Sequence, residues 1–246
     1  EIGRVFRNEG IDSTHSAEFT MLEAYMAWGD QRTIARLIQD IVVAAADAVG
    51  SRQIETPKGV IDLDGEWPWL SVFPAMSERF GDEVTVDTPL ETLHRIADAH
   101  EVEYDPKWAA DKRAMELFAE VIEPDLLQPT FVYDYPSIAQ PLARQHRSEP
   151  GKVEAWDLII GGLERGTGFT ELVDPVIQRE VLVSQSLKAA GGDPEAMQFD
   201  GDFIESLESG VPPMGGLGLG IDRLIMLLTG VGIRETILYP LLRPQS

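Results

Sequence analysis

Hydrophobic and polar positions along this chain change their spacing several times, and each spacing predicts a different element. Residues 1–9 and 18–28 alternate in the manner of strands, and the polar residues 10–17 between them indicate a hairpin with a long loop. Apolar residues then recur at helical spacing through 32–49, where Asp30 can cap the first turn and the glycine that follows ends the helix. A hairpin followed by a helix is therefore predicted.

The rest of the chain mixes further helices with short strands. Helices are predicted at residues 88–99, 106–122, 174–190, 203–208 and 221–228. Strand character marks residues 59–73, residues 131–133, residues 156–160 and 163–165 joined by Gly161-Gly162, and a run through Phe169 and Glu171. Strands joined by hairpins, with helices outside them, favour an α+β fold with a mainly antiparallel sheet in one domain.

Charge and composition narrow the classes of function. The 246 residues include 20 basic and 42 acidic ones, and the net charge of −22 opposes non-specific attraction to nucleic acid, so any RNA contact must be local. The absence of cysteine excludes disulfides, thiolate catalysis and cysteine-ligated zinc. No signal peptide opens the chain, and the longest apolar stretch, residues 38–49, is too short and too charged to span a membrane. We therefore expect a cytoplasmic setting.

The first hairpin carries charged residues among apolar ones. Alternation places Phe19, Glu23 and Tyr25 on one face of their strand, and it places Arg7 and Glu9 on one face of the partner strand. A guanidinium and two carboxylates can then line one cleft. The alternative is a structural Arg/Glu pair across the strands on a solvated face.

A second group of acids surrounds the Gly161-Gly162 turn. A two-residue hairpin places Ile159 opposite Glu164, and Asp157 then lies diagonally across from Glu164. Two carboxylates that close repel each other unless a proton or a cation lies between them, and Mg²⁺ prefers oxygen ligands of this kind. The sequence therefore indicates a magnesium site, with solvated surface acids as the alternative.

Two further patterns bear on ligand binding. Thr167, Phe169 and Glu171 alternate onto one face, which puts another acid beside an aromatic ring. The pattern Gly-x-Gly-x-Asp-Arg at residues 218–223 lets the backbone approach a ligand closely, while the helix start and Arg223 favour an anion. The alternative for the glycine pattern is a tight packing turn between a strand and a helix.

Taken in order, these segments resemble the class II lysyl-tRNA synthetases over nearly the whole chain. Residues 6–15 and 18–25 are similar to motif 2 of that family, and residues 218–223 are similar to motif 3. Family patterns continue in residues 137–144, 166–172 and 234–240. The resemblance implies the class II fold, in which helices flank an antiparallel sheet, and the ATP-dependent activation of L-lysine for transfer to tRNA(Lys).

The resemblance also implies a role for each matching residue. Arg7 would grip the lysine carboxylate and the α-phosphate, and Arg223 would bind the γ-phosphate. Glu9, His15 and Phe19 would hold ATP, with Phe19 stacked on adenine. Asp157 and Glu164 would hold Mg²⁺. The lysine site would be formed by Arg7, Glu23, Tyr25, Thr167, Phe169 and Glu171, with Glu23, Tyr25 and Glu171 receiving the ε-ammonium.

This chain departs from the family pattern at three positions. Thr167 stands where the family has asparagine, Gln140 where it has serine, and Asp157 where it has glutamate. The threonine and neighbouring stretches are more similar to the synthetase domain of actinobacterial proteins that also transfer lysine to phosphatidylglycerol. In such a parent, a membrane lysyltransferase module would lie outside this chain, and the protein would be membrane-associated.

The resemblance also has implications for the complete protein. Residue 1 falls within a strand-like run, and motif 1, an upstream acid that binds the α-amino group and the anticodon-binding domain are missing, so we expect residues 1–246 to be a partial catalytic domain. The full-length protein would be a homodimer. Two other functions stay open: lysylation of another acceptor such as elongation factor P, and a non-catalytic binding module. The second is opposed by the presence of Arg7, Glu23, Glu164, Glu171 and Arg223.

Overall fold

A computed structural model describes residues 1–7, 12–137, 139–191 and 196–240 of the chain. The strands are β1 (Ile2–Phe6), β2 (Glu18–Ala27), β3 (Gln53–Thr56), β4 (Gly59–Asp62), β5 (Trp69–Ser71), β6 (Thr130–Tyr133), β7 (Ala155–Ile159), β8 (Glu164–Thr170) and β9 (Met214–Gly220). The α-helices are α1 (Gln31–Val49), α2 (Val72–Phe80), α3 (Leu90–Ala99), α4 (Ala110–Val121), α5 (Pro175–Ala190), α6 (Gly201–Glu208), α7 (Ile221–Thr229) and α8 (Ile233–Thr236). A short 3-10 helix, η1, spans Glu123–Asp125.

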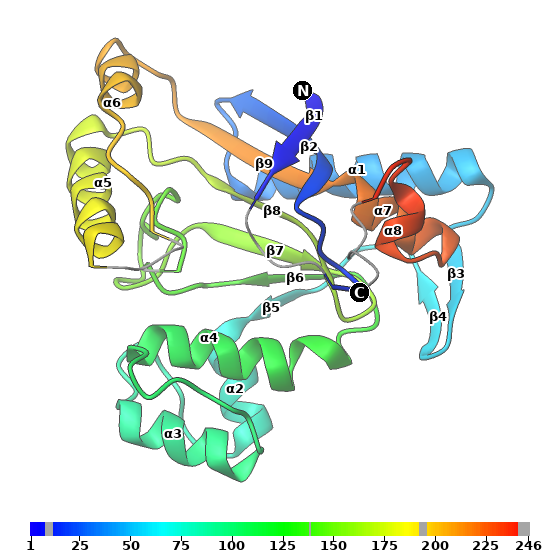
Figure 1. Ribbon diagram of the computed structural model, residues 1–246, viewed down its shortest axis with the longest axis horizontal. Coiled ribbons are helices and arrows are strands. Elements are labelled where there is room, and N and C mark those ends of the chain that lie inside the picture. The colour runs from blue at the N-terminus through cyan, green and yellow to red at the C-terminus, as the bar shows by residue number, and fades with distance from the viewer. Residues whose placement is uncertain (8–11, 138, 192–195, 241–246) are drawn as a thin grey trace, which may run out of the picture.

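One large sheet organises the described residues. Its strand order is β1-β2-β9-β8-β7-β6-β5, and every neighbouring pair is antiparallel except β5 with β6. Strands β3 and β4 form a separate hairpin beside α7 and α8 (Figure 1). The predicted α+β class with a mainly antiparallel sheet flanked by helices is therefore confirmed.

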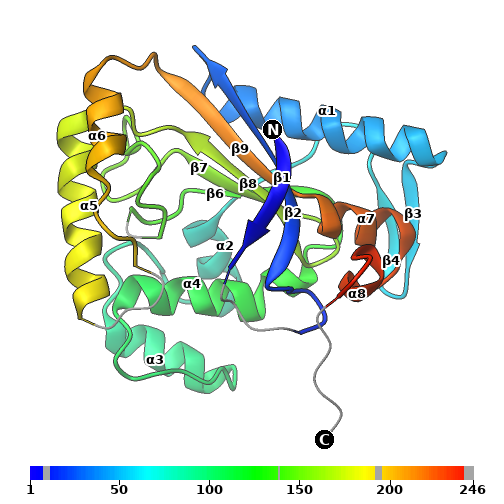
Figure 2. The ribbon, with the colours of Figure 1, turned by 45° about the horizontal axis from the view of Figure 1, so that its top comes forward.

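Helices cover the two faces of the sheet unequally. Helix α1 lies along one face, where Ile34 and Ile38 are fully buried in the same core as Trp156 and Leu158 of β7. Helices α2, α3 and α4 lie on the opposite side, where they pack near β6 and β7 (Figures 1 and 2). None of the helices in the described residues covers strands β2, β9 and β8 on this second side, and the candidate site lies there (Figures 1 and 2).

Helix boundaries follow the capping signals in the sequence. The Asp30 side chain accepts hydrogen bonds from the backbone N–H groups of Arg32 and Thr33, and Gly50 ends α1 in the left-handed conformation. Asp174 caps α5 in the same way, with a proline at the first turn. The helices predicted at residues 32–49 and 174–190 are confirmed.

The middle of the chain differs from the prediction. Residues 59–73 were expected to have strand character, but they divide into β4, β5 and the start of α2, because a short apolar run at 69–73 fits a strand and a helix equally well. The helix expected from residue 106 begins at Ala110, after a turn. Helix α8 and strand β3 were not predicted. In every described segment, the helices fall short of the length and apolar character that a membrane crossing needs.

Candidate active site

The uncovered face of β2, β9 and β8 forms the floor of the candidate site. Pairing across these strands creates two rows of residues, Glu23–Gly218–Thr167 and Tyr25–Gly216–Phe169. Because glycine has no side chain, β9 leaves room over itself for side chains from the neighbouring segments. A Cβ atom at Gly216 would overlap the Glu171 carboxylate and would lie 2.8 Å from Tyr25 Cε1. Gly216 is therefore required by the side chains that lie over it.

A cavity of about 260 Å³ opens at one end of this floor. Its walls include six of the residues predicted from the sequence: Arg7, His15, Phe19, Glu164, Thr167 and Arg223. The guanidinium carbon of Arg7 lies 5.4 Å from the centroid of the Phe19 ring, and Arg7 Nη2 lies 3.8 Å from Met21 Sδ. The cavity thus presents a cation beside a partly buried aromatic ring, which suits a planar base bearing phosphates. Glu9 lies outside the described residues.

Arg223 occupies the wall formed by the first turn of α7. Its Nη1 donates to the backbone oxygen of Glu164 at 3.0 Å, and its Nη2 lies 3.0 Å from His15 Nε2. The nearest carboxylate oxygen, Glu164 Oε2, lies 3.8 Å away. Arg165 is a neighbour of Arg223. Its burial and, to a smaller extent, the positive charge of Arg223 lower the pKa of Arg165 to about 10. Two neighbouring guanidinium groups make this wall attractive to an anion.

An acidic group lies at the turn between β7 and β8. The predicted pairing of Ile159 with Glu164 is present, and both glycines of the turn have φ near 70°. A β-bulge then shifts the register, so Asp157 faces Thr167 rather than the residue that a regular hairpin would give. Burial, followed by the charge of Glu164, raises the pKa of Asp157 well above its usual range. The two carboxylates therefore interact despite the shift.

Sequence reasoning missed two members of this acidic group. Glu123 belongs to η1, and burial followed by the charge of Glu164 raises its pKa to about 7. Tyr135 follows β6 and donates a hydrogen bond to Asp157, and burial followed by the charge of Asp157 raises its pKa. Neither residue belongs to a recognisable local pattern, because each reaches the site through packing between distant segments.

A second pair of acids lies farther along the floor, beyond the cavity walls. Glu171 directly follows β8, and its backbone N–H donates to Met214 O at 2.9 Å. Burial, followed by the charge of Glu23, raises the pKa of Glu171 to about 7. Tyr25 donates a hydrogen bond to Glu23, and its own pKa is raised by burial and then by Glu171. This arrangement favours a cationic ligand, because a cation would allow both carboxylates to be ionised.

Asp222 fastens the floor to the helices that follow it. Its Oδ2 accepts from the Thr20 backbone N–H at 2.7 Å, and its Oδ1 accepts from the Thr236 hydroxyl at 2.8 Å. This buried carboxylate thus joins β2, α7 and α8. In the Gly-x-Gly-x-Asp-Arg pattern, the aspartate therefore holds the fold and the arginine faces the cavity.

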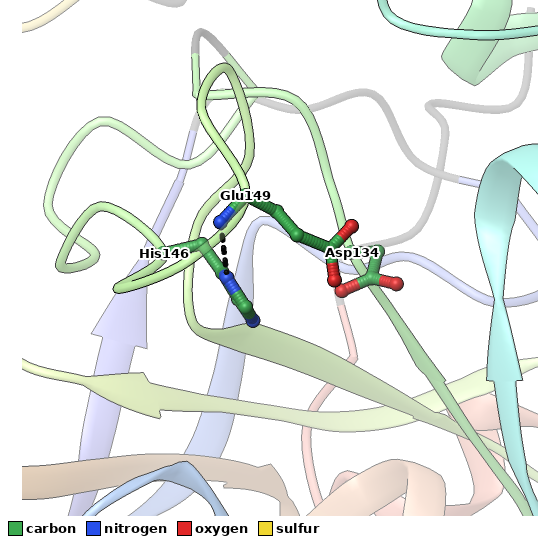
Figure 3. A group of neighbouring side chains, drawn as sticks. All are labelled: Asp134, His146 and Glu149. Atoms are coloured by element: carbon green, nitrogen blue, oxygen red, sulfur yellow. Dashed lines mark hydrogen bonds between the residues drawn. The ribbon is translucent and has the colours of Figure 1, made fainter.

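Asp134, His146 and Glu149 form a separate cluster away from the cavity (Figure 3). Their ligand atoms lie within 4.8 Å of one another, a spacing compatible with a metal ion. However, Lys152 Nζ donates to Glu149 Oε2 at 2.5 Å and lies 3.6 Å from Asp134 Oδ2. His146 Nδ1 accepts from the Glu149 backbone N–H at 3.0 Å. The lysine ammonium already neutralises these acids, so we interpret the cluster as a structural ion-pair network.

Comparison with known proteins identifies relatives over the whole of this architecture. The family described as tRNA synthetases class II (D, K and N) matches residues 1–243. A lysine–tRNA ligase of Kineococcus radiotolerans is 49% identical over 248 residues, which cover 100% of this chain and 50% of the ligase. A lysine–tRNA ligase of Mycobacterium tuberculosis is 47% identical over 254 residues, again covering 100% of this chain and 50% of the ligase.

A third relative has a second activity in its name. The lysylphosphatidylglycerol biosynthesis bifunctional protein LysX of Mycobacterium marinum is 46% identical over 250 residues, which cover 99% of this chain and 23% of that protein. The chain thus spans about half the length of the ligases and less of the bifunctional protein. The family resemblance that the motifs indicated is confirmed.

Proposed function

Because the chain belongs to the class II tRNA synthetases of the D, K and N type, we propose that it activates L-lysine with ATP and transfers the lysyl group to tRNA(Lys). One observation carries the proposal. An anion-attracting cavity and a pair of acids, the partly buried Glu171 and the exposed Glu23, lie on the same sheet face, separated by glycines of β9. The cavity suits a nucleotide and the acids suit an ammonium group, so the two substrates would meet on one floor.

Different residues of the cavity contact different parts of ATP. Phe19 offers its ring to adenine, and Arg7 beside it meets the α-phosphate and the lysine carboxylate. Arg223 meets the terminal phosphates, and His15, whose Nε2 lies 3.0 Å from Arg223 Nη2, completes this wall of the ATP site by holding that guanidinium. Glu9 completes the ATP site as the family resemblance implies.

Asp157 and Glu164 have the donor chemistry that a Mg²⁺ ion needs. Both supply carboxylate oxygens, and the pKa of Asp157 is raised by burial and by Glu164 when no cation stands between them. Mg²⁺ commonly binds through one or two carboxylates together with phosphate oxygens, and such an ion neutralises charge on the phosphates of ATP. The aspartate side chain is one methylene shorter than the glutamate found in the family pattern, so this ligand would reach less far toward the ion.

The acid pair selects lysine through its ε-ammonium. Glu23 and Glu171 supply negative charge, and the Tyr25 hydroxyl and the Phe169 ring complete the surroundings. An amino acid without the ammonium would leave the carboxylates without a cationic partner, and comparable losses in other synthetases discriminate by roughly 10⁴ to 10⁵. Thr167, in the row between Glu23 and Asp157, separates the lysine and magnesium sites.

The reaction needs positioning and charge neutralisation more than proton transfer. A carboxylate oxygen of lysine attacks the α-phosphorus in line, the bond to the β-phosphate oxygen breaks, and pyrophosphate leaves with the electron pair. The carboxylate is already ionised, so no general base is required, while Arg7 and Arg223 oppose the negative charge on the phosphates. A hydroxyl of tRNA(Lys) then attacks the lysyl carbonyl and AMP leaves.

The proposal extends to the complete protein. Residues 1–246 would form the part of a catalytic domain that carries motifs 2 and 3, within a cytoplasmic homodimer. The 46% identity with LysX favours a second candidate, in which the lysyl group is destined for phosphatidylglycerol through a further membrane module.

Lysine-dependent exchange of pyrophosphate into ATP tests the activation step. We expect exchange that requires lysine and magnesium, and charging of tRNA(Lys) that exceeds lysylation of elongation factor P. Exchange together with preferential lysylation of elongation factor P would show that the lysyl group is transferred to a protein acceptor rather than to tRNA(Lys). A correctly folded protein that shows no exchange would be better explained as a non-catalytic binding module.

A further inference from the structure

Asp12 contacts Thr14 and His15, which line the nucleotide cavity, and none of the roles described above includes it. Its Oδ1 accepts from the backbone N–H groups of Thr14 and His15, at 2.6 and 2.7 Å. Its Oδ2 lies 2.8 Å from Nδ1 of the His15 ring. One carboxylate therefore does two separate things: Oδ1 fixes a turn of the backbone and Oδ2 meets an imidazole.

The partners of His15 determine which ring nitrogen carries the proton. Arginine can only donate hydrogen bonds, so the 3.0 Å contact between Arg223 Nη2 and His15 Nε2 requires Nε2 to accept. The ring proton of neutral His15 then lies on Nδ1, where Asp12 Oδ2 accepts it. The Thr14 hydroxyl, 3.1 Å from Nδ1, donates to Asp12 Oδ1 and so adds a second acceptor on the same side. Every described neighbour favours the same tautomer.

This chain of contacts matters for Arg223 because it leaves the arginine charge available. The two hydrogen bonds that hold its guanidinium end on neutral acceptors, the Glu164 carbonyl oxygen and the His15 ring. The Glu164 carboxylate, at 3.8 Å, is only a loose partner. A guanidinium whose direction is fixed by hydrogen bonds to neutral acceptors is well prepared to meet an anion.

We propose that Asp12 is a positioning residue for ATP: it sets the tautomer of His15, and His15 in turn aims Arg223 at the terminal phosphates. This inference rests on the proposed function for its ligand, and on geometry alone for the tautomer. The resemblance to the synthetase family assigns His15 and Arg223 to ATP, but it does not assign Asp12.

Asp12→Asn separates this role from that of holding the loop. The remaining carbonyl oxygen can still accept from Thr14 and His15, so the turn is kept. The new amide group, however, presents an N–H to His15 Nδ1, which favours the tautomer with its proton on Nε2. That proton would face the donor Nη2 of Arg223 and break their contact, and comparable tautomer errors are costly in enzymes that depend on an oriented histidine.

The tautomer is measured directly by ¹⁵N NMR of the histidine side chains. The chain has four histidines, and His15→Phe identifies the signals of His15. We expect a protonated Nδ1 and an unprotonated Nε2 in the unchanged protein, and the reverse in Asp12→Asn. A His15 ring with its proton on Nε2 in the unchanged protein overturns the proposal, whatever the enzyme activity.

A double-mutant cycle measures the consequence for ATP. We expect Asp12→Asn to raise the Kd for ATP by about 10- to 150-fold, the range for loss of one hydrogen bond to a charged group, and to leave the Kd for AMP within about twofold. In a His15→Phe background, Asp12→Asn should have no further effect. Asp40→Asn, the same chemical change on the exposed side of α1, serves as the matched control.

Each result decides between distinct conclusions. An Asp12→Asn effect that persists without His15 shows that Asp12 acts only through the loop, and an unchanged Kd for ATP shows that it does not act at all. Both results overturn the proposal. If the unchanged protein binds no ATP, the proposed function fails instead, and the NMR measurement still decides the tautomer.

Discussion

Replacing Glu171 by glutamine removes one charge from the acid pair while keeping the shape of the side chain. Burial and the neighbouring Glu23 raise the pKa of Glu171 from 4.5 to about 7. This rise corresponds to about 3 kcal/mol by which the surroundings disfavour the ionised carboxylate. A bound lysine ammonium would instead favour the ionised form of Glu171, because the ammonium would pair with the negative charge of the carboxylate.

Substitution should therefore weaken lysine binding far more than ATP binding. Loss of one partner from a buried, hydrogen-bonded charge pair costs about 2–5 kcal/mol, so we expect the KM for lysine in pyrophosphate exchange to rise at least about 30-fold. The KM for ATP should stay within about twofold of the original value. Glu55→Gln on the exposed hairpin β3–β4 provides a control with the same chemical change.

The same variant should be more stable than the original protein when no ligand is present. Because the pKa of Glu171 is raised by folding, the folded state binds more protons than the unfolded state between pH 4.5 and about 7, and the free energy of unfolding falls as the pH rises through that range. At pH 8, Glu171→Gln should gain up to about 3 kcal/mol in urea unfolding, and at pH 4 the gain should vanish. An unchanged KM for lysine, or a loss of stability at pH 8, would refute this reasoning.

Three further variants test other parts of the site and the fold. Gly216→Ala places a methyl group where Glu171 and Tyr25 lie, so the KM for lysine should rise about tenfold or more while the KM for ATP is little changed. Asp157→Asn removes one charge of the proposed metal site, and we expect exchange to require about tenfold more magnesium for half-maximal rate. Ile38→Ala empties space in the core beneath the sheet and should lower the free energy of unfolding by about 2–5 kcal/mol in urea, which equal stability would contradict.

The sequence predicted the fold best where local signals coincide with tertiary packing. Helix α5 begins at the predicted Asp174-Pro175 signal and ends at Ala190, because an aspartate cap and a proline define its first turn without help from other segments. The turn at Gly161-Gly162 was predictable for a similar reason, since both residues have positive φ. Local chemistry decided these features.

Other features depend on contacts that no local pattern reveals. The bulge in β8 changes the partner of Asp157, and a regular hairpin pattern cannot show it. Helix α2 follows β5 without a break, and the mainly apolar segment 69–73 does not mark the change from strand to helix. Such boundaries are decided by the core that each side chain enters.

The candidate site shows the same division. The motifs predicted that Arg223 binds an anion, but its contact with His15 joins residues 208 positions apart. The sequence alone indicated no role for Asp12 in the site, because a loop aspartate is most often a solvated turn residue. Its second role becomes visible only when the partner of His15 is known.

The most direct test of the central claim is lysine-dependent exchange of pyrophosphate into ATP, measured in two proteins. One is this chain, and the other is a chimera in which residues 1–246 replace the matching segment of the lysine–tRNA ligase of Kineococcus radiotolerans. We predict that the chimera exchanges only when lysine and magnesium are present, and that Glu171→Gln raises its KM for lysine. A folded chimera without lysine-dependent exchange, made beside an active parent ligase, would contradict the account.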